Sequence, residues 1–151
     1  MNKKQIAIIA AGVIVVGIIL AALAVVFNAG PHVPNVKFVS FSPEGKQTIK
    51  DGQEKVITFK VKNYENYDVD NARVVTTLQG DPKFFLIDNA YFTIKPPIAG
   101  PNGESADLTV NIIGTNLGNQ QAIEDKITVA LYVSTNTEPS DRRQFDIRLE
   151  K

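Results

Sequence analysis

The strongest constraint on this chain is an unbroken apolar segment near its amino terminus. Residues Ile6 to Phe27 are 22 consecutive residues drawn from Ala, Val, Ile, Leu and Phe, apart from Gly12 and Gly17. An α-helix rises about 1.5 Å per residue, so this segment spans about 33 Å as a helix. The hydrocarbon core of a bilayer is about 30 Å thick, and a segment that crosses it must be helical to satisfy its backbone. We therefore predict a transmembrane helix over residues 6–27.

The charges on either side of this segment predict its orientation. Lys3 and Lys4 precede it, whereas the first charged residue after it is Lys37. Positively charged residues favour the cytoplasmic side of a membrane. We expect residues 1–5 to be cytoplasmic and the larger, carboxyl-terminal part to be extracytoplasmic, as in a single-pass protein of the cell membrane.

Two other fates of the apolar segment remain open. Cleavage after the small residues of Ala22-Leu23-Ala24 would release a secreted ligand-binding module. Cleavage before Gln5 would instead give a pilin-like filament subunit whose apolar helices bundle into the fibre. The apolar run is longer than the usual core of a signal peptide, and Lys4 stands where a prepilin carries Gly or Ala. These features favour a retained anchor.

Small residues recur four positions apart within the predicted helix. Ala7 and Ala11 form one such pair, and Gly17 and Ala21 form another. Small residues at this spacing let transmembrane helices approach closely. They predict a helix partner in the membrane, which includes a second copy of this chain, although single anchors are also rich in Ala and Gly.

Residues 28–35 are expected to form an extended linker. Gly30, Pro31 and Pro34 interrupt regular structure there. Eight extended residues reach at most about 25 Å, which would hold the following domain near the membrane. His32, the sole histidine of the chain, lies in this linker and is expected to be an exposed linker residue, because no other ligand or catalytic partner accompanies it.

From residue 36 onward the sequence has the pattern of a β-sandwich. In the segment 55–62, Ile57, Phe59 and Val61 alternate with polar residues, as in a strand with one buried face. Ala106, Leu108, Val110 and Ile112 alternate in the same way, whereas the segment 84–87 is either a buried strand or an exposed docking strip. The expected strand segments are 36–41, 55–62, 72–78, 84–87, 91–94, 106–112, 127–133 and 145–149.

Short strands separated by Gly, Pro and Asn turns predict an all-β fold. We expect an Ig-like antiparallel β-sandwich of about seven strands over residues 36–151, preceded by the single transmembrane helix.

Composition excludes several classes of function. The chain has 16 basic and 16 acidic residues, so it lacks the positive charge that nucleic-acid binding requires. It has no cysteine, which removes disulfides and thiolate metal sites. The sequence contains neither a recognisable nucleophile–base arrangement nor a phosphate-binding glycine loop. We therefore expect neither an enzyme nor a cofactor-binding protein.

Several turn and strand motifs occur in an order known from one group of domains. Asp51-Gly-Gln-Glu54 precedes a strand that ends at Asn63, a second strand covers residues 71–78, and Pro101-Asn-Gly-Glu-Ser105 leads into a third. This order resembles the Ig-like domains of the CARDB and NEW3 type in bacterial and archaeal surface proteins, over most of residues 36–149. The resemblance implies a sandwich domain of the cell envelope, of archaeal origin. The acidic segment after Asn63 departs from the short glycine turn that is common there.

The helix-plus-sandwich arrangement also looks like archaeal membrane-anchored proteins such as accessory subunits of the archaellum. This likeness rests on architecture and on no residue motif.

The loop 64–71 carries the most notable polar residues. Glu65, Asp68, Asp70 and Asn71 offer the oxygen ligands that calcium prefers, and they form a weak candidate calcium site. No glycine folds the segment around an ion and the spacing matches no EF-hand, so a plain solvated turn is favoured.

Tyr64 and Tyr67 in the same loop form either an interface patch or a cap on the core. The expected function is a structural or interaction domain that docks another envelope, filament or membrane-complex component. Open sheet edges provide a second route to such assembly, because they can accept a partner strand.

Overall fold

The structure is a computed structural model that describes residues 32–151. The predicted cytoplasmic segment 1–5, the transmembrane helix 6–27 and its packing residues Ala7, Ala11, Gly17 and Ala21 lie outside the described residues and stay predictions. Within residues 32–151, no helix is long and apolar enough to cross a bilayer.

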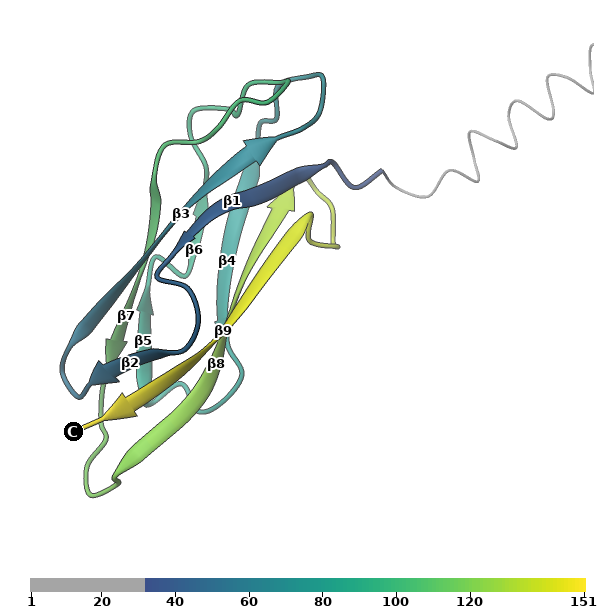
Figure 1. Ribbon diagram of the computed structural model, residues 1–151. Helices are drawn as coiled ribbons and strands as arrows, with labels where there is room; N and C mark the ends of the chain where they lie inside the picture. Colours follow the sequence, from purple (N-terminus) through teal and green to yellow (C-terminus); the bar gives the residue numbers. More distant parts are fainter. Residues whose placement is uncertain (1–31) are drawn as a thin grey trace, which may run out of the picture. The chain divides into compact units, whose positions relative to one another are not determined.

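Residues 32–151 contain nine strands in two facing sheets (Figure 1). The four-stranded sheet has the order β1-β3-β7-β5, and the five-stranded sheet has the order β2-β9-β8-β4-β6. The strands are β1 (Val36–Ser42), β2 (Gln47–Lys50), β3 (Glu54–Asn63), β4 (Ala72–Leu78), β5 (Phe85–Asp88), β6 (Tyr91–Thr93), β7 (Leu108–Gly114), β8 (Ala122–Val133) and β9 (Asp141–Glu150). The all-β sandwich prediction is confirmed, with more strands than expected.

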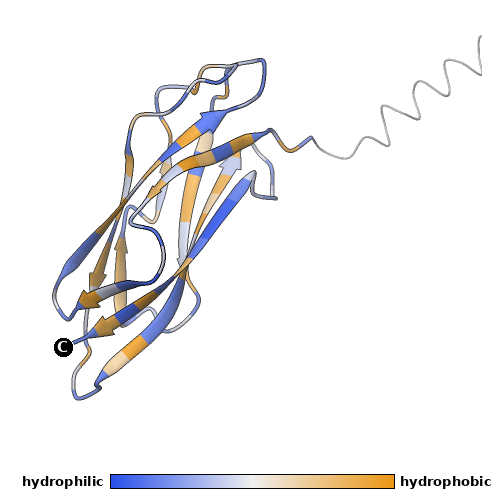
Figure 2. Ribbon diagram, viewed as in Figure 1, coloured by the Kyte–Doolittle hydropathy of each residue, from blue (hydrophilic) through white to orange (hydrophobic). Residues whose placement is uncertain are grey.

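The alternation of residues along each strand places the core between the sheets. Apolar and polar residues alternate along the strands (Figure 2), and in β3 the predicted inward residues Ile57, Phe59 and Val61 are all buried. Phe59 lies at the centre of an aromatic cluster in which its ring stacks on Phe41 at 5.5 Å and meets Phe38 edge-on at 5.3 Å. In β3 the core is therefore built from the face that the sequence pattern predicted.

The prediction of a wholly antiparallel sandwich is wrong at one strand pair. The chain leaves the four-stranded sheet after β1 and crosses to the other sheet, where β2 pairs parallel with the end of β9. β2 was not predicted, because Ile49 is the single apolar residue in this four-residue strand. Its pairing partner, residues 147–150, comes from the other end of the chain.

Other predicted segments differ in their limits; β8 and β9, for example, begin five and four residues before the predicted segments 127–133 and 145–149. β7 begins at Leu108, so Ala106 lies outside the strand and is exposed, and Leu108 is half-buried. Before β7 the Ser105 hydroxyl instead accepts a hydrogen bond from the Val61 backbone at 3.0 Å. In the segment 84–87 the buried-strand alternative is confirmed for Phe85, whereas Phe84 is buried but precedes β5, and Leu86 is exposed.

A loop platform as the candidate interaction site

Two long loops interlock at the end of the sandwich where β3 ends and β4 begins. We call residues 63–71 and 95–105 the loop platform. Val69 and Ile98, one from each loop, exchange backbone hydrogen bonds of 2.9 Å in both directions. Both side chains are buried. The two loops therefore form one unit with its own apolar contact.

Asn63 at the end of β3 organises the loop platform. Its side chain is fully buried, and its Nδ2 donates to the backbone oxygens of Tyr67 at 2.7 Å and Ile98 at 3.0 Å. Its Oδ1 accepts a hydrogen bond from the Glu65 backbone at 2.9 Å. One buried amide thus uses both N–H groups and its oxygen to hold both loops, as a buried polar group must to offset its desolvation.

Gly100 shows how closely the two loops approach. A Cβ atom at this position would lie 2.3 Å from the backbone oxygen of Tyr67 and 2.7 Å from that of Glu65. The Gly100 backbone also donates to Asp68 Oδ1 at 3.0 Å. Any larger residue at position 100 would force the loops apart.

The two tyrosines of the loop platform are partly exposed. Tyr64 is 44% exposed and Tyr67 is 47% exposed, whereas Val69 and Ile98 cover the core at this end. The Lys62 ammonium lies 5.5 Å from the centre of the Tyr64 ring. The structure therefore places both rings on the surface rather than as caps on the core, and their use as an interface stays a prediction.

The acidic residues of the loop bind backbone groups. Glu65 Oε1 accepts a hydrogen bond from the Asn35 backbone at 2.6 Å, and Asp68 is held by Gly100 as described above. Asp70 is exposed, and Asn71 adopts a φ of 54°, a left-handed conformation that Asn tolerates. Within residues 32–151, no three His, Asp or Glu side chains are grouped to hold a metal ion. The geometry thus gives Glu65, Asp68 and Asn71 a role in shaping the turn.

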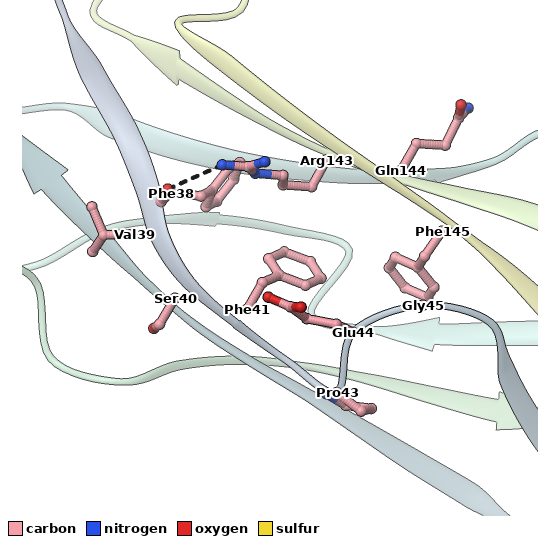
Figure 3. A pocket seen from close by; sticks show the side chains of 10 residues that line it. All are labelled: Phe38, Val39, Ser40, Phe41, Pro43, Glu44, Gly45, Arg143, Gln144 and Phe145. Atoms are coloured by element: carbon pink, nitrogen blue, oxygen red, sulfur yellow. Dashed lines mark hydrogen bonds between the residues drawn. The ribbon is translucent and has the colours of Figure 1, made fainter.

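A cavity that the sequence did not predict opens between β1 and β9. Its volume is about 310 Å³, and it lies where β1 leaves the four-stranded sheet (Figure 3). The rings of Phe41 and Phe145 lie 5.9 Å apart within its lining. The pairing of β1 with β3 also shifts register between Phe38 and Ser40 beside this cavity.

Side chains from β9 bind the β1 edge beside the cavity. Asp141 Oδ2 accepts a hydrogen bond from the Phe38 backbone N–H at 2.9 Å. The Arg143 guanidinium donates to the Phe38 carbonyl at 3.3 Å (Figure 3). These two side chains take the place of a neighbouring strand at Phe38. The sequence carries one indication of this role. Arg143 lies two positions before the buried Phe145 and four before the buried Ile147, so this charged residue occupies a position on the inward face of β9.

Comparison with known proteins reveals likeness in structure alone. No protein-family profile and no curated protein matches this sequence. The periplasmic chaperone SfaE is similar, with 13% identity, a TM-score of 0.49, and coverage of 76% of this chain and 56% of the chaperone. A CARDB domain from Pyrococcus furiosus, solved in complex with di-metal ions, has 19% identity, a TM-score of 0.49, and coverage of 80% of this chain and 97% of that domain.

The E. coli chaperone DraB is similar at 16% identity and a TM-score of 0.48, over 76% of this chain and 56% of DraB. This chain thus spans little more than half the length of the two chaperones. CARDB is one of the two domain types that the turn motifs resemble, and a CARDB domain is among the similar structures. Likeness at these scores carries no functional argument, and the sandwich assignment rests on the strands themselves.

Proposed function

We propose that this chain is a single-pass, membrane-anchored interaction protein whose extracytoplasmic sandwich docks another envelope, filament or membrane-complex component. The observation that carries the proposal is the pair of half-exposed tyrosines on the interlocked loops. Protein interfaces are enriched in Tyr, and their strongest contacts come from such residues.

The rigidity of the loop platform supports a role in binding. Asn63 and Gly100 hold the two loops in one arrangement, so little backbone entropy would be lost on association. A tyrosine side chain has two rotatable torsions, so it adds contact area at a small entropic cost. The Lys62 ammonium over the Tyr64 ring restricts that ring further.

The position of the loop platform favours a partner at the membrane surface. Glu65 binds the backbone of Asn35, the last residue of the predicted linker, so the loop platform lies beside the point where the chain enters the sandwich. With residues 6–27 as an anchor and eight linker residues, a component of the same membrane would lie within reach of the loop platform.

Replacing both Tyr64 and Tyr67 by alanine is expected to abolish docking while the fold remains. We expect the amount of partner that co-purifies with the full-length chain from gently solubilised native membranes to fall about tenfold or more, the effect of losing interface hot spots. Tyr91→Ala is the matched control, because Tyr91 is 64% exposed but lies on β6. Equal recovery of the partner with the double variant and with Tyr91→Ala, at unchanged thermal stability, would refute the role of the loop platform.

The anchor is tested separately by the mature amino terminus. We expect mass spectrometry of the protein from its native membrane fraction to show Lys3 and Lys4 retained together with the whole apolar segment. A terminus at Gln5 would support the filament-subunit alternative, and a terminus immediately after Ala24 would support the secreted module. Either processed terminus would contradict the proposed anchor.

A further inference from the structure

A polar hollow lies on the outer face of the five-stranded sheet, beside the start of β4. Its volume is about 310 Å³, which is at the small end of the range of about 300 to 1,000 Å³ typical of ligand pockets. The residues that line it carry hydroxyl, amide or guanidinium groups, and they are Asn71, Arg73, Tyr91, Thr93, Ser134 and Thr135. Among these six described residues one is cationic, none is anionic and none is Val, Ile or Leu. The lining is therefore suited to a polar ligand.

Antiparallel pairing brings the lining residues together from separate parts of the chain. Arg73 of β4 lies opposite Thr93 of β6 on one side and opposite Tyr132 of β8 on the other. The neighbours of Arg73 in β4 are buried, so Arg73 projects from the face turned away from the core. Tyr91, two positions before Thr93, projects from the same face and is 64% exposed. The hollow thus lies between β6 and the turn after β8.

The Arg73 guanidinium is held in position without being neutralised. Its Nη2 donates to the Asn136 carbonyl at 3.3 Å, and its Cζ lies 5.5 Å from the centre of the Tyr132 ring. No carboxylate in residues 32–151 forms an ion pair with Arg73. A guanidinium has five N–H donors, so donors and a full positive charge remain for a ligand.

The turns that border the hollow are tied to one another. Asn71 and Ser134 both adopt the left-handed backbone conformation, with φ values of 54° and 53°. The Ser134 backbone donates to the Asn71 carbonyl at 3.3 Å, which joins the start of β4 to the turn after β8. A ligand bound between these turns would therefore order little backbone, which lowers the entropic cost of binding.

The charge, the hydroxyl groups and the aromatic ring match one chemical class of ligand. A guanidinium binds a carboxylate through charge-assisted hydrogen bonds. Hydroxyl and amide groups both donate and accept hydrogen bonds, as the ring hydroxyls of a sugar do. The exposed Tyr91 ring offers an apolar surface with a polar tip, which suits the C–H face of a sugar ring.

We propose that this hollow binds a uronic acid, a sugar whose ring carries a carboxylate, either free or as one residue of an acidic glycan. In this arrangement the carboxylate pairs with Arg73 and the sugar ring packs on Tyr91. The ring hydroxyls exchange hydrogen bonds with Asn71, Thr93 and Ser134. The volume of the hollow suits a single sugar residue.

The same lining disfavours other anionic ligands. Phosphate groups are commonly bound at a helix N-terminus or by clustered basic side chains, whereas this hollow contains one guanidinium and lies on a sheet. A bound peptide gains affinity from backbone pairing and specificity from pockets for its side chains. Neither of these would use the hydroxyl groups of Ser134 and Thr135. A sugar acid uses the charge, the ring and the hydroxyl groups together.

Titration of the full-length chain with D-glucuronic acid tests the site, followed by saturation-transfer NMR of the ligand in a detergent that contains no sugar. We expect saturable binding. Glucose, which lacks the carboxylate, and acetate, which lacks the ring, are each expected to bind about tenfold more weakly or worse. These comparisons use the unaltered chain, so they do not depend on the folding of a variant. Tighter binding of glucuronic acid oligomers than of the monomer would identify a glycan as the source, and equal affinity would identify the free sugar.

Variants assign the two contacts separately. Arg73→Gln is expected to reduce the affinity for glucuronic acid to that for glucose, because only the acid uses the charge. The matched control is Arg142→Gln, since Arg142 projects from the same face of the sheet but does not line the hollow. Tyr91→Ala is expected to weaken binding of both sugars about tenfold, the effect of losing a principal aromatic contact, whereas Tyr67→Ala weakens neither.

Equal affinities of the unaltered chain for glucuronic acid and glucose would overturn the proposal. Tighter binding of inorganic phosphate or of a glutamate-containing tripeptide than of glucuronic acid would overturn it as well, as would an equal loss of affinity in Arg142→Gln and Arg73→Gln. The Tyr64→Ala/Tyr67→Ala variant is expected to bind glucuronic acid as the unaltered chain does. This result separates the hollow from docking of a protein partner at the loop platform.

Discussion

Replacing Phe59 by alanine is expected to destabilise the sandwich by about 4 kcal/mol, because truncation of a fully buried aromatic leaves a cavity as well as losing its burial. The Phe59 ring contacts three other aromatic rings, Phe38, Phe41 and Phe92, at centroid distances of 5.3, 5.5 and 6.5 Å. Phe38 and Phe41 come from β1 and Phe92 from β6, so this side chain joins the two sheets.

Chemical denaturation followed by circular dichroism measures this loss in the free energy of unfolding. A loss of this size corresponds to a fall in melting temperature of about 15 °C for a domain of this length. The matched control is Phe59→Leu, which keeps most of the buried volume and is expected to destabilise by about 1 kcal/mol. Similar free energies of unfolding for the alanine and leucine variants would contradict the central place of this ring.

Replacing Asn63 by alanine is expected to cost about 3 kcal/mol, because it leaves several polar groups without partners. The carbonyl oxygens of Tyr67 and Ile98 and the N–H of Glu65 each lose the hydrogen bond that the Asn63 side chain supplies. The buried volume of the lost side chain adds to the effect. A further consequence is release of the two loops from one another.

The control for this variant is Asn66→Ala, because Asn66 lies in the same loop but is exposed. We expect Asn66→Ala to change the free energy of unfolding by less than about 0.5 kcal/mol, as is usual for exposed positions. Hydrogen exchange of the amides in residues 64–71 and 95–105 is expected to accelerate in Asn63→Ala alone. Unchanged exchange together with unchanged stability would show that Asn63 does not organise the loop platform.

Much of the fold was predictable from local sequence pattern. A period of two residues between apolar positions identified β3 and β4, and it named Ile57, Phe59 and Val61 as the inward face. The loop 64–71 was likewise located between these strands from its polar and aromatic residues. The same reasoning failed at β2, where a single apolar residue shows no period.

The candidate site was predictable in its residues but not in its construction. Tyr64 and Tyr67 could be identified from residue type. Whether they form an interface patch or a cap on the core remained open until their exposure was known. The roles of Asn63, Gly100 and Arg143 were missed, because each acts through a contact with a distant segment. Asn63 reaches Ile98 across 35 positions, and Phe38 reaches Asp141 across 103.

Local regularities alone therefore predicted an apolar segment long enough to span a bilayer, an all-β domain and the inward face of most strands. Length and period are properties of neighbouring residues, so no knowledge of pairing is needed to read them. Only the tertiary structure decided which strands are neighbours and that side chains of β9 close the sheet edge at Phe38. Those outcomes depend on hydrogen bonds and packing between segments far apart in the chain, and a one-dimensional pattern does not contain them.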